Sequence, residues 1–450
     1  MQEKLTLDLS FCLDEKGFSL DEFITVLRDT FDGEHGLSKI ASLILQLYQE
    51  SLLYHILRKS KDSITCCGQS NFVLNGSYDR RIRTTLGEVN LSYHRIKCKE
   101  CNKDIVPLKE HLSIDKYQTK TNELEEVIIN AVSETTYRRA VNTVSEHGLI
   151  NIPYRTAHDW VMRTDCDEIQ LPVDMVNSVG PLQIFADGTG FKGTPKDGKH
   201  KKGDLKTIIG VNTQGEVFPL GSHTDKNWSE IAQTWEDSKL QLADGSVFIS
   251  DGELGLSESF ANQVEFVQRC QWHVGRDLYH VMNANGGTIK DSKPLQKGLA
   301  GVLAIELPKK DFCDVSNEEK EDIEIKMENA QIALDKLITH LDTEGYEIAS
   351  RYMKRAKYTM FSYIKRWFKY GLICPRASSL IERVTRELAR RLKRIAYNWS
   401  EKGCAKIAKI VLKKFVDKKA WENYWKQKKK IRGNVFFFIR NYKLSQNFAH

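Results

Sequence analysis

The sequence contains no apolar run that approaches the roughly 20 residues of a membrane-spanning helix. Its longest candidate, Val435–Ile439, is only a few residues long. The N-terminal segment MQEKLTLDLS carries acids where a secretory signal has a basic and then an apolar stretch. A disulfide framework is also missing, because the ten cysteines are scattered over 450 residues. We therefore expect a cytoplasmic protein with reduced thiols, some of which could form one metal site.

Acidic residues are scarce in the last hundred positions. From Arg351 to His450 there are 28 Lys and Arg against 5 Asp and Glu, a local net charge of +23. The first 350 residues carry 39 against 55, a net charge of −16. A region this basic attracts a polyanion, and nucleic acid is the expected partner. The alternative is a solvated lysine-rich surface, as runs such as Lys426–Lys430 often are.

The length allows two to four domains with substantial cores. Residues 1–60 are expected to be helical, because apolar residues recur at helical spacing through Leu37–Leu57, and to serve a core or self-association. Residues 61–118 are expected to form a β module. There, strand-like segments around Arg80–Thr85 and Val89–Ile96 flank a Gly87-Glu88 turn and indicate a hairpin.

Cysteines bracket this hairpin: Cys66-Cys67-Gly68 precedes it and Cys98-Lys99-Glu100-Cys101 follows it. The pattern resembles a zinc ribbon, in which four thiolates hold one Zn²⁺ ion. Ile64 stands where a C-x-x-C pair ending at Cys67 would begin, so His94 or His111 is an alternative ligand. The competing interpretation is a metal-free hairpin with unused thiols.

Residues 119–170 predict three helices, Glu123–Val132, Tyr137–Glu146 and Ala157–Met162, the second closing at His147-Gly148. Two short helices joined by a glycine-containing turn outline a helix-turn-helix. A structural three-helix linker is the alternative. The residues that favour DNA contact are Arg138, Arg139 and Arg155.

Two acids follow apolar strands within residues 178–285. In LQIFADGTGFKG, residues 182–193, Asp187 is expected at the exit of a buried strand, in a Gly188-Thr189-Gly190 turn. In SVFISDG, residues 246–252, the strand leads to Asp251 and Gly252. The remaining elements of this stretch are strands at Leu205–Val211, Glu216–Gly221 and Val264–Arg269, and helices at Ser229–Leu242, Leu256–Ala261 and from Val274.

This element order, β-β-β-α-β-α-β-α, is that of an RNase H-like fold, an α/β core with a mixed five-stranded sheet. Its first and fourth strands are neighbours, so Asp187 and Asp251 would meet. A helical insertion follows over residues 286–375. Within it, Arg351–Tyr370 alternates aromatic residues with cations, which suits base stacking and phosphate contact or, equally, the core-facing stripe of a helix.

The helix Ser378–Ala396, within residues 376–415, carries a single early acid, Glu382. Arg386 and Arg390 follow it at i+4 and i+8 beside an apolar stripe. The spacing would place one metal ligand next to a row of phosphate contacts. Alternatively, Ser379-x-x-Glu382 is a capping box that only closes the helix start.

The series Asp187-Gly-Thr, Asp251-Gly, Cys270-Gln-Trp-His273 and Ser-x-x-Ile-Glu382-Arg resembles the DDE transposases of the Mutator superfamily, which includes many bacterial insertion-sequence transposases. The C-x-x-H pair is the specific part. The resemblance spans roughly residues 120–415, including Trp399-Ser400-Glu401-Lys402-Gly403. It implies that Asp187, Asp251 and Glu382 hold the catalytic metals, with Cys270 and His273 in a structural or supporting role. Independently of the family, Cys270 and His273, with His280, could be half of a zinc site.

Such an enzyme uses two Mg²⁺ or Mn²⁺ ions roughly 4 Å apart to activate the attacking oxygen and stabilise the leaving one. We expect Asp187 to bridge the ions, Asp251 to hold one and Glu382 the other. Water would first free a 3′-hydroxyl at the element end, which would then attack target DNA. Lys192, Arg386 and Arg390 are candidate phosphate contacts. The basic C-terminal hundred residues, which end in a basic tail at residues 416–450, are expected to bind the DNA backbone.

The expected partners are double-stranded DNA, both element ends and target, and at least one further copy of the chain, in a nucleoid-associated complex without a membrane. Two other functions compete. One is a non-catalytic DNA-binding protein derived from a transposase. The other is an RNase H-like nuclease or resolvase that hydrolyses DNA without strand transfer.

Overall fold

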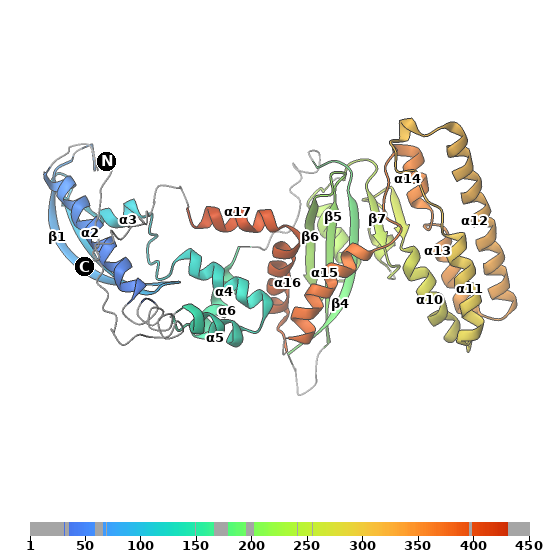
Figure 1. Cartoon of the computed structure of the whole chain (residues 1–450), viewed down its shortest axis with the longest axis horizontal. Helices are drawn as coiled ribbons and strands as arrows, with labels where there is room; N and C mark the ends of the chain where they lie inside the picture. Colours follow the sequence, from blue (N-terminus) through green and yellow to red (C-terminus); the bar gives the residue numbers. More distant parts are fainter. Residues whose placement is uncertain are drawn as a thin grey trace, which may run out of the picture. The chain divides into compact units, whose positions relative to one another are not determined.

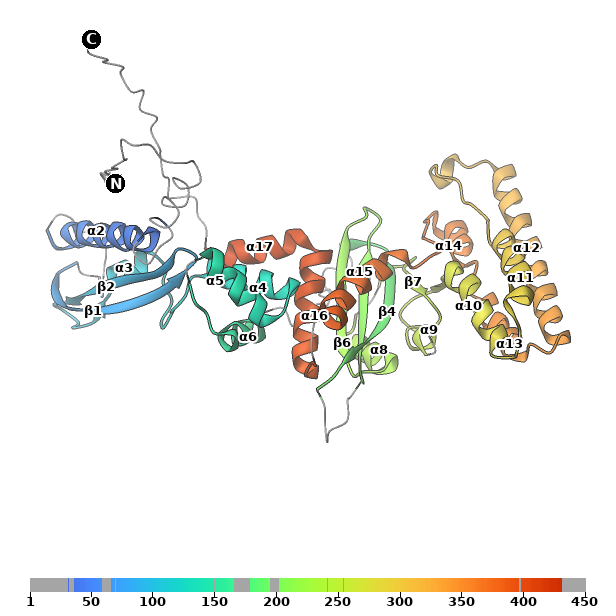
Figure 2. The same ribbon diagram turned by 60° about the horizontal axis from the view of Figure 1, so that its bottom comes forward.

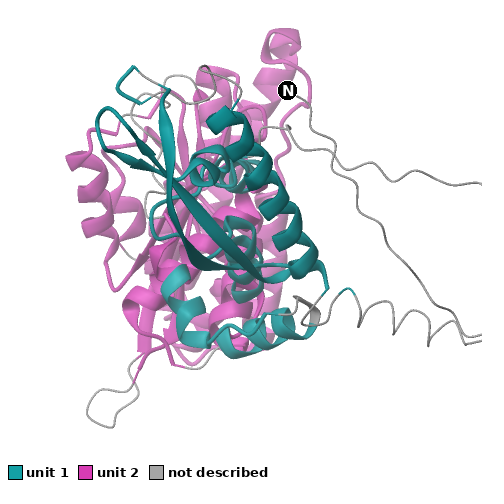
Figure 3. Ribbon diagram, turned by 90° about the vertical axis from the view of Figure 1, so that its left-hand side faces the viewer, with its two compact units in different colours: residues 1–132, 137–160, 419–450 teal, residues 133–136, 161–418 magenta. Residues whose placement is uncertain are grey.

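The computed structural model describes Phe31 and residues 36–58, 66–68, 70–148, 150–165, 179–194, 202–240, 242–253, 255–395 and 398–430. The chain divides into two compact units (Figure 3). Unit 1 comprises residues 1–132, 137–160 and 419–450, and unit 2 comprises residues 133–136 and 161–418. Within the described residues, no helix has both the length and the apolarity needed to cross a bilayer.

Unit 1 begins with a helix packed on an antiparallel sheet. Helix α2 (Leu37–Arg58) lies along the hairpin of β1 (Phe72–Thr84) and β2 (Gly87–Cys98), and β3 (Asp104–Ile105) and α3 (Pro107–His111) follow (Figures 1 and 2). The hairpin is confirmed, but its strands are longer than expected. Gly87 pairs with Thr84 and starts β2 with φ +104°, so the loop is Thr85-Leu86 and the predicted Gly87-Glu88 turn is wrong.

The three predicted helices of the next segment are confirmed as α4 (Asn122–Glu134), α5 (Tyr137–Gly148) and α6 (Tyr154–Arg163). Helix α17 (Lys418–Lys428) packs against α4. Its Trp421 Nε1 donates a hydrogen bond to Asn130 Oδ1 at 3.0 Å, and Lys428 Nζ lies 3.1 Å from Glu125 Oε2. The segment expected to be a basic tail therefore begins as a packed helix whose lysines meet acids. Residues 431–450, including Val435–Ile439, lie outside the described part.

Unit 2 is built on a mixed five-stranded sheet in the order β6-β5-β4-β7-β8. Strands β4 (Gln183–Lys192), β5 (Lys202–Val211) and β6 (Val217–Thr224) are antiparallel, whereas β7 (Val247–Ser250) runs parallel to β4 and to β8 (Phe266–Arg269). Helices α8 (Trp228–Asp237), α9 (Leu256–Ser259) and α10 (Gln271–Asn283) complete the predicted element order, which is confirmed. The first and fourth strands of this series are neighbours, as expected.

Strand β4 does not turn at its glycines. It pairs with β7 only through Phe185, but it stays paired with β5 through Gly188, Thr189 and Gly190 as far as Lys192. The predicted turn is therefore wrong, and Asp187 lies in the middle of a strand. Its position is special for another reason, because the parallel partner β7 ends beside it.

The two faces of the sheet carry different helices (Figures 1 and 2). Ile184 and Phe248 share one core with Trp235 of α8 and Phe260 beside α9. Since side chains alternate along a strand, Asp187 points to the opposite face. There α15 (Ser379–Ala389) contacts β4, and α16 (Glu401–Val416) contacts β6.

A helical insertion separates α10 from α15, as expected. It consists of α11 (Ile289–Val302), the 3₁₀ turn η1 (Phe312–Asp314), α12 (Asn317–Thr343), α13 (Glu347–Lys357) and α14 (Ser362–Tyr370). Most of its predicted aromatic stripe serves the core, because Phe361, Tyr363 and Trp367 are buried and Tyr358 is the exposed exception. The segment after α15 continues as the π-helical η2 (Arg390–Arg394).

Candidate functional site

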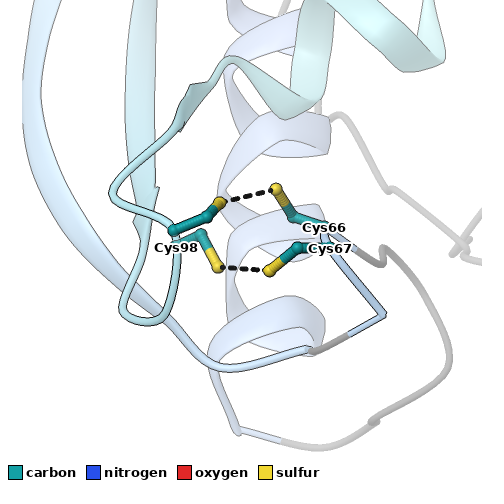
Figure 4. Close-up of side chains that lie close together, drawn as sticks. Cys66, Cys67 and Cys98 are labelled. Carbon is teal, nitrogen blue, oxygen red and sulfur yellow. Dashed lines mark hydrogen bonds between the residues drawn. The ribbon is translucent and has the colours of Figure 1, made fainter.

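Four cysteines of unit 1 form a group that could hold a metal ion such as zinc (Figure 4). The sulfur atoms of Cys66, Cys67, Cys98 and Cys101 all lie within 4.8 Å of one another. Cys66 Sγ is 3.4 Å from Cys101 Sγ, and Cys67 Sγ is 3.8 Å from Cys98 Sγ. A tetrahedral site with Zn–S bonds of about 2.3 Å separates its sulfurs by roughly 3.8 Å. The spacing therefore fits a four-thiolate zinc site, and neither His94 nor His111 belongs to the group.

The backbone explains how two adjacent cysteines reach one centre. Cys67 has φ +47° and Gly68 has φ +79°, so the chain reverses there in the left-handed region. On the opposite side, Cys98 ends β2 and its carbonyl accepts a hydrogen bond from the N–H of Asn102. A hydrogen bond from the backbone of Lys103, followed by one from Cys66, lowers the pKa of the Cys101 thiol to about 7. The Cys101 thiol is thus roughly half ionised at pH 7 before any metal binds, whereas the pKa values of Cys66 and Cys67 are raised.

In unit 2 the two predicted aspartates lie close together at the end of β7. Asp187 is two residues beyond Phe185, the last β4 residue paired with β7, and Asp251 is two residues beyond its partner Ile249. Burial, with a smaller contribution from the charge of Asp251, raises the pKa of Asp187 to about 6. Thr385 of α15 offsets part of that rise, although its hydroxyl makes no hydrogen bond with any described group. Two acids that repel each other in a partly buried place are typical of a cation site.

Glu382, the third predicted acid, is joined to these aspartates through His273. Its Oε1 lies 3.9 Å from His273 Nε2, and His273 interacts electrostatically with both Asp187 and Asp251. One turn further along α15, Thr385 influences the pKa of Asp187, and α15 contacts β4. The helix therefore brings Glu382 to the sheet face on which Asp187 lies.

The C-x-x-H pair supports this glutamate. Cys270 Sγ lies 3.1 Å from His273 Nδ1 and accepts the backbone N–H of Ser378 at 3.3 Å. The Ser378 hydroxyl donates to Glu382 Oε1 at 3.2 Å. Burial opposes ionisation of Cys270, but the hydrogen bonds from His273 and Ser378 outweigh it and lower its pKa to about 7. The pair thus links the start of α10 to the start of α15, and no described third ligand makes a metal group with it or with His280.

The capping-box interpretation of Glu382 is wrong. The residue at the N-cap of α15 is Ser378 rather than Ser379, and its side chain makes no capping hydrogen bond. It binds the carboxylate of Glu382 instead. A glutamate held by a serine and facing a histidine is positioned for something other than closing its own helix.

Sequence reasoning missed Glu253 and Arg269. The Glu253 backbone N–H donates to Asp251 Oδ1 at 2.9 Å, and burial, followed by smaller contributions that include the charge of Asp251, raises the pKa of Glu253. A Cβ added to Gly252 would lie 1.1 Å from Nη1 of the flexible Arg269 side chain, and the φ of +89° favours glycine at this position. The sequence Asp251-Gly252-Glu253 shows a second acid next to Asp251, so Glu253 could have been found from it. No sequence pattern indicates Arg269.

The residues predicted to contact phosphate differ in their distance from the acids and in their exposure. Lys192 is five residues along β4 from Asp187, roughly 16 Å at strand spacing, so it does not reach the acids. Arg390 is engaged by Glu387 at 3.0 Å and Glu134 at 2.5 Å, whereas Arg386 is exposed. In unit 1 the side chains of Arg138, Arg139 and Arg155 are exposed. The Trp399–Gly403 segment runs beside the end of β4, where the Trp399 N–H donates to the Lys192 carbonyl.

No family model matches the chain, and no curated protein matches it either. The candidate sites therefore rest on their geometry and on the sequence resemblance alone.

Replacing Asp187 by Asn is expected to stabilise the protein at pH 7. The folded-state pKa lies above the unfolded one, so burying the charged form costs stability above pH 6, and this cost disappears as pH falls towards 4. The shift corresponds to about 2–3 kcal/mol in the free energy of unfolding. Denaturant unfolding in EDTA should show D187N more stable than wild type at pH 7 and nearly equal at pH 4. The exposed Asp244→Asn control should show no such pH-dependent difference.

Proposed function

We propose that this chain is a DDE-type DNA transposase that cleaves DNA at the ends of its element and joins them to target DNA. One observation carries the proposal: Asp187, Asp251 and the Glu382 helix, which are far apart in sequence, gather on one face of the sheet around His273. These are the three acids that the resemblance assigns to the metals. Their surroundings, a buried cysteine–histidine pair and a serine, orient the glutamate.

The architecture supports an RNase H-like core. Three antiparallel strands are followed by two parallel ones, in the order β6-β5-β4-β7-β8. A helical insertion precedes the glutamate helix, as the resemblance implies. The two aspartates follow the point at which the first and fourth strands of the series stop pairing.

The donor set fits hard divalent cations such as Mg²⁺ or Mn²⁺, which prefer carboxylate oxygens. When bound, such ions would activate the attacking oxygen and stabilise the leaving one. Asp187, Asp251 and Glu382 are the residues that would hold these ions. Two separate ions do not require all three acids to surround one point. Among the described residues, these acids do not form a group whose ligand atoms all lie within 4.8 Å of one another. Ser378 and His273 hold the Glu382 carboxylate near the start of α15.

DNA binding is proposed for the three-helix segment of unit 1. We expect the R138A/R155A double variant to bind duplex DNA more weakly and to lower the slope of log affinity against log salt by about 2, since each lost phosphate contact removes about 0.9. Fluorescence anisotropy from low to moderate salt measures both. The charge-matched control K326A/K354A changes two exposed lysines of the insertion and should keep the slope. An unchanged slope in R138A/R155A would contradict this assignment.

Incubation with DNA that carries the ends of the encoding element, with Mn²⁺ or with EDTA, tests the function. The proposal expects metal-dependent cleavage at the ends and joined products with target DNA. A shift of the DNA without cleavage would support a binding protein, and cleavage without joined products would support a nuclease or resolvase.

A further inference from the structure

Trp272 is the most exposed tryptophan in the described part of the chain. It lies next in sequence to His273 of the acid site. It is 55% exposed at the second position of α10, whereas its neighbours Gln271 and His273 are 9% and 7% exposed. A lone exposed apolar residue needs no explanation. Here the surroundings of the indole give it one.

The indole contacts a cation and a histidine of the acid site. Arg276 Cζ lies 5.1 Å from the Trp272 ring centroid. The His273 ring is 4.9 Å away at 85°, an edge contact, and His273 Nε2 lies 3.9 Å from the Glu382 carboxylate. Arg276 also interacts electrostatically with Asp251. Trp272 is therefore one residue away from a group that contacts the candidate catalytic glutamate.

We propose that Trp272, backed by Arg276, is a stacking platform for an unpaired base of the DNA substrate next to the phosphate that is cut. This inference rests on the proposed function and adds a specificity-determining residue to it. An indole face binds any base by stacking, and a guanidinium beside it adds cation–π attraction and a phosphate contact. A base inside a duplex cannot reach such a platform, so the strand must open at this point.

The rest of the site is consistent with a single unstacked nucleotide. Arg276 Nε donates to Asp277 Oδ1 at 2.6 Å, which fixes the guanidinium beside the indole. Trp272 is 55% exposed to solvent despite its contacts with Arg276 and His273. The helix that carries it is anchored at its first turn by buried Cys270, so the platform is held at a constant distance from the acids.

The test uses the full chain and two fluorescein-labelled duplexes, one with a three-nucleotide unpaired dT arm and one with an abasic arm of equal length. Affinities are measured by anisotropy in Ca²⁺. Wild type is expected to prefer the dT arm by about 5- to 150-fold, the range for one stacked base. W272A should lose most of this preference and W272F should keep most of it. Tyr358→Ala, which removes an aromatic residue that is 78% exposed elsewhere in the same unit, should leave it unchanged.

Preference for the dT arm in W272A equal to that of wild type would overturn the proposal, as would an equal loss in Y358A. If W272A bound both duplexes as tightly as wild type binds the dT arm, the proposal would also be overturned, because the indole would contribute nothing to binding of the arm. W272A is expected to unfold at the same temperature as wild type, because the Trp272 side chain is exposed. This measurement verifies that the variant is folded. The outcome is separable from the proposed function: a protein that shows the preference but never cuts DNA would keep this inference and lose the transposase.

Discussion

The E382Q variant is expected to lose DNA cleavage by about 10²–10⁴-fold while it binds element DNA as tightly as wild type. Glutamine keeps the size of the side chain and the contact with Ser378, but it replaces a charged metal ligand by a neutral one. Losing several kcal/mol of metal-assisted charge stabilisation in the transition state corresponds to this range. Single-turnover cleavage with Mn²⁺, with binding measured in parallel, separates the chemical step from affinity.

Glu387→Gln is the matched control. Glu387 lies on the same helix, its side chain is 33% exposed against 35% for Glu382, and it pairs with Arg390 rather than with the acid site. E387Q should cleave DNA within a few-fold of wild type. D187N and D251N should behave like E382Q, and combining them should add little, because the three acids act as one unit. Full activity in E382Q would remove Glu382 from the reaction.

The second large effect is expected at the four cysteines of unit 1. Because binding of a structural zinc ion is coupled to folding, with apparent free energies of about 10–16 kcal/mol in small zinc domains, C98S should release the metal and unfold the β module. Purified wild type should contain about one zinc per chain by atomic absorption. Hydrogen exchange should show loss of protection in β1 and β2 in C98S and in wild type treated with a strong chelator.

Cys313→Ser is the control here, since Cys313 is an exposed thiol outside the group. It should retain zinc and the protection of the hairpin. If C98S kept a protected hairpin and wild type contained no zinc, the hairpin would be a metal-free module. Cleavage by unit 2 is not needed for this experiment, so the two predictions fail independently.

The sheet of unit 2 could be predicted because its signals are local. Each strand is an apolar run bounded by glycine or acid, and the order of strands and helices is enough to place β4 beside β7. The position of Asp187 within β4 could not be predicted. The Gly-Thr-Gly sequence that follows Asp187 resembles a turn. In the structure, Gly188 instead lies in a strand close to another side chain, since a Cβ there would lie 3.2 Å from Glu253 Oε2.

The zinc group shows a similar limit. The four cysteines are recognisable in the sequence, but Ile64 breaks the expected C-x-x-C spacing. The positive φ of Cys67 brings the sulfurs of Cys66 and Cys67 close to those of Cys101 and Cys98. A backbone conformation of this kind depends on the fold around it. The same holds for α17, whose lysines resembled a free basic tail but lie against Glu125 and Glu126 of α4.

Crystals of the protein soaked in Mn²⁺ and measured at the manganese absorption edge test the central claim most directly. The account predicts anomalous density bridged by Asp187, with Asp251 and Glu382 on the same or the neighbouring peak, and no such peaks in D187N. Manganese bound elsewhere, or at Asp187 and Asp251 with Glu382 still turned only to His273 and Ser378, would contradict it.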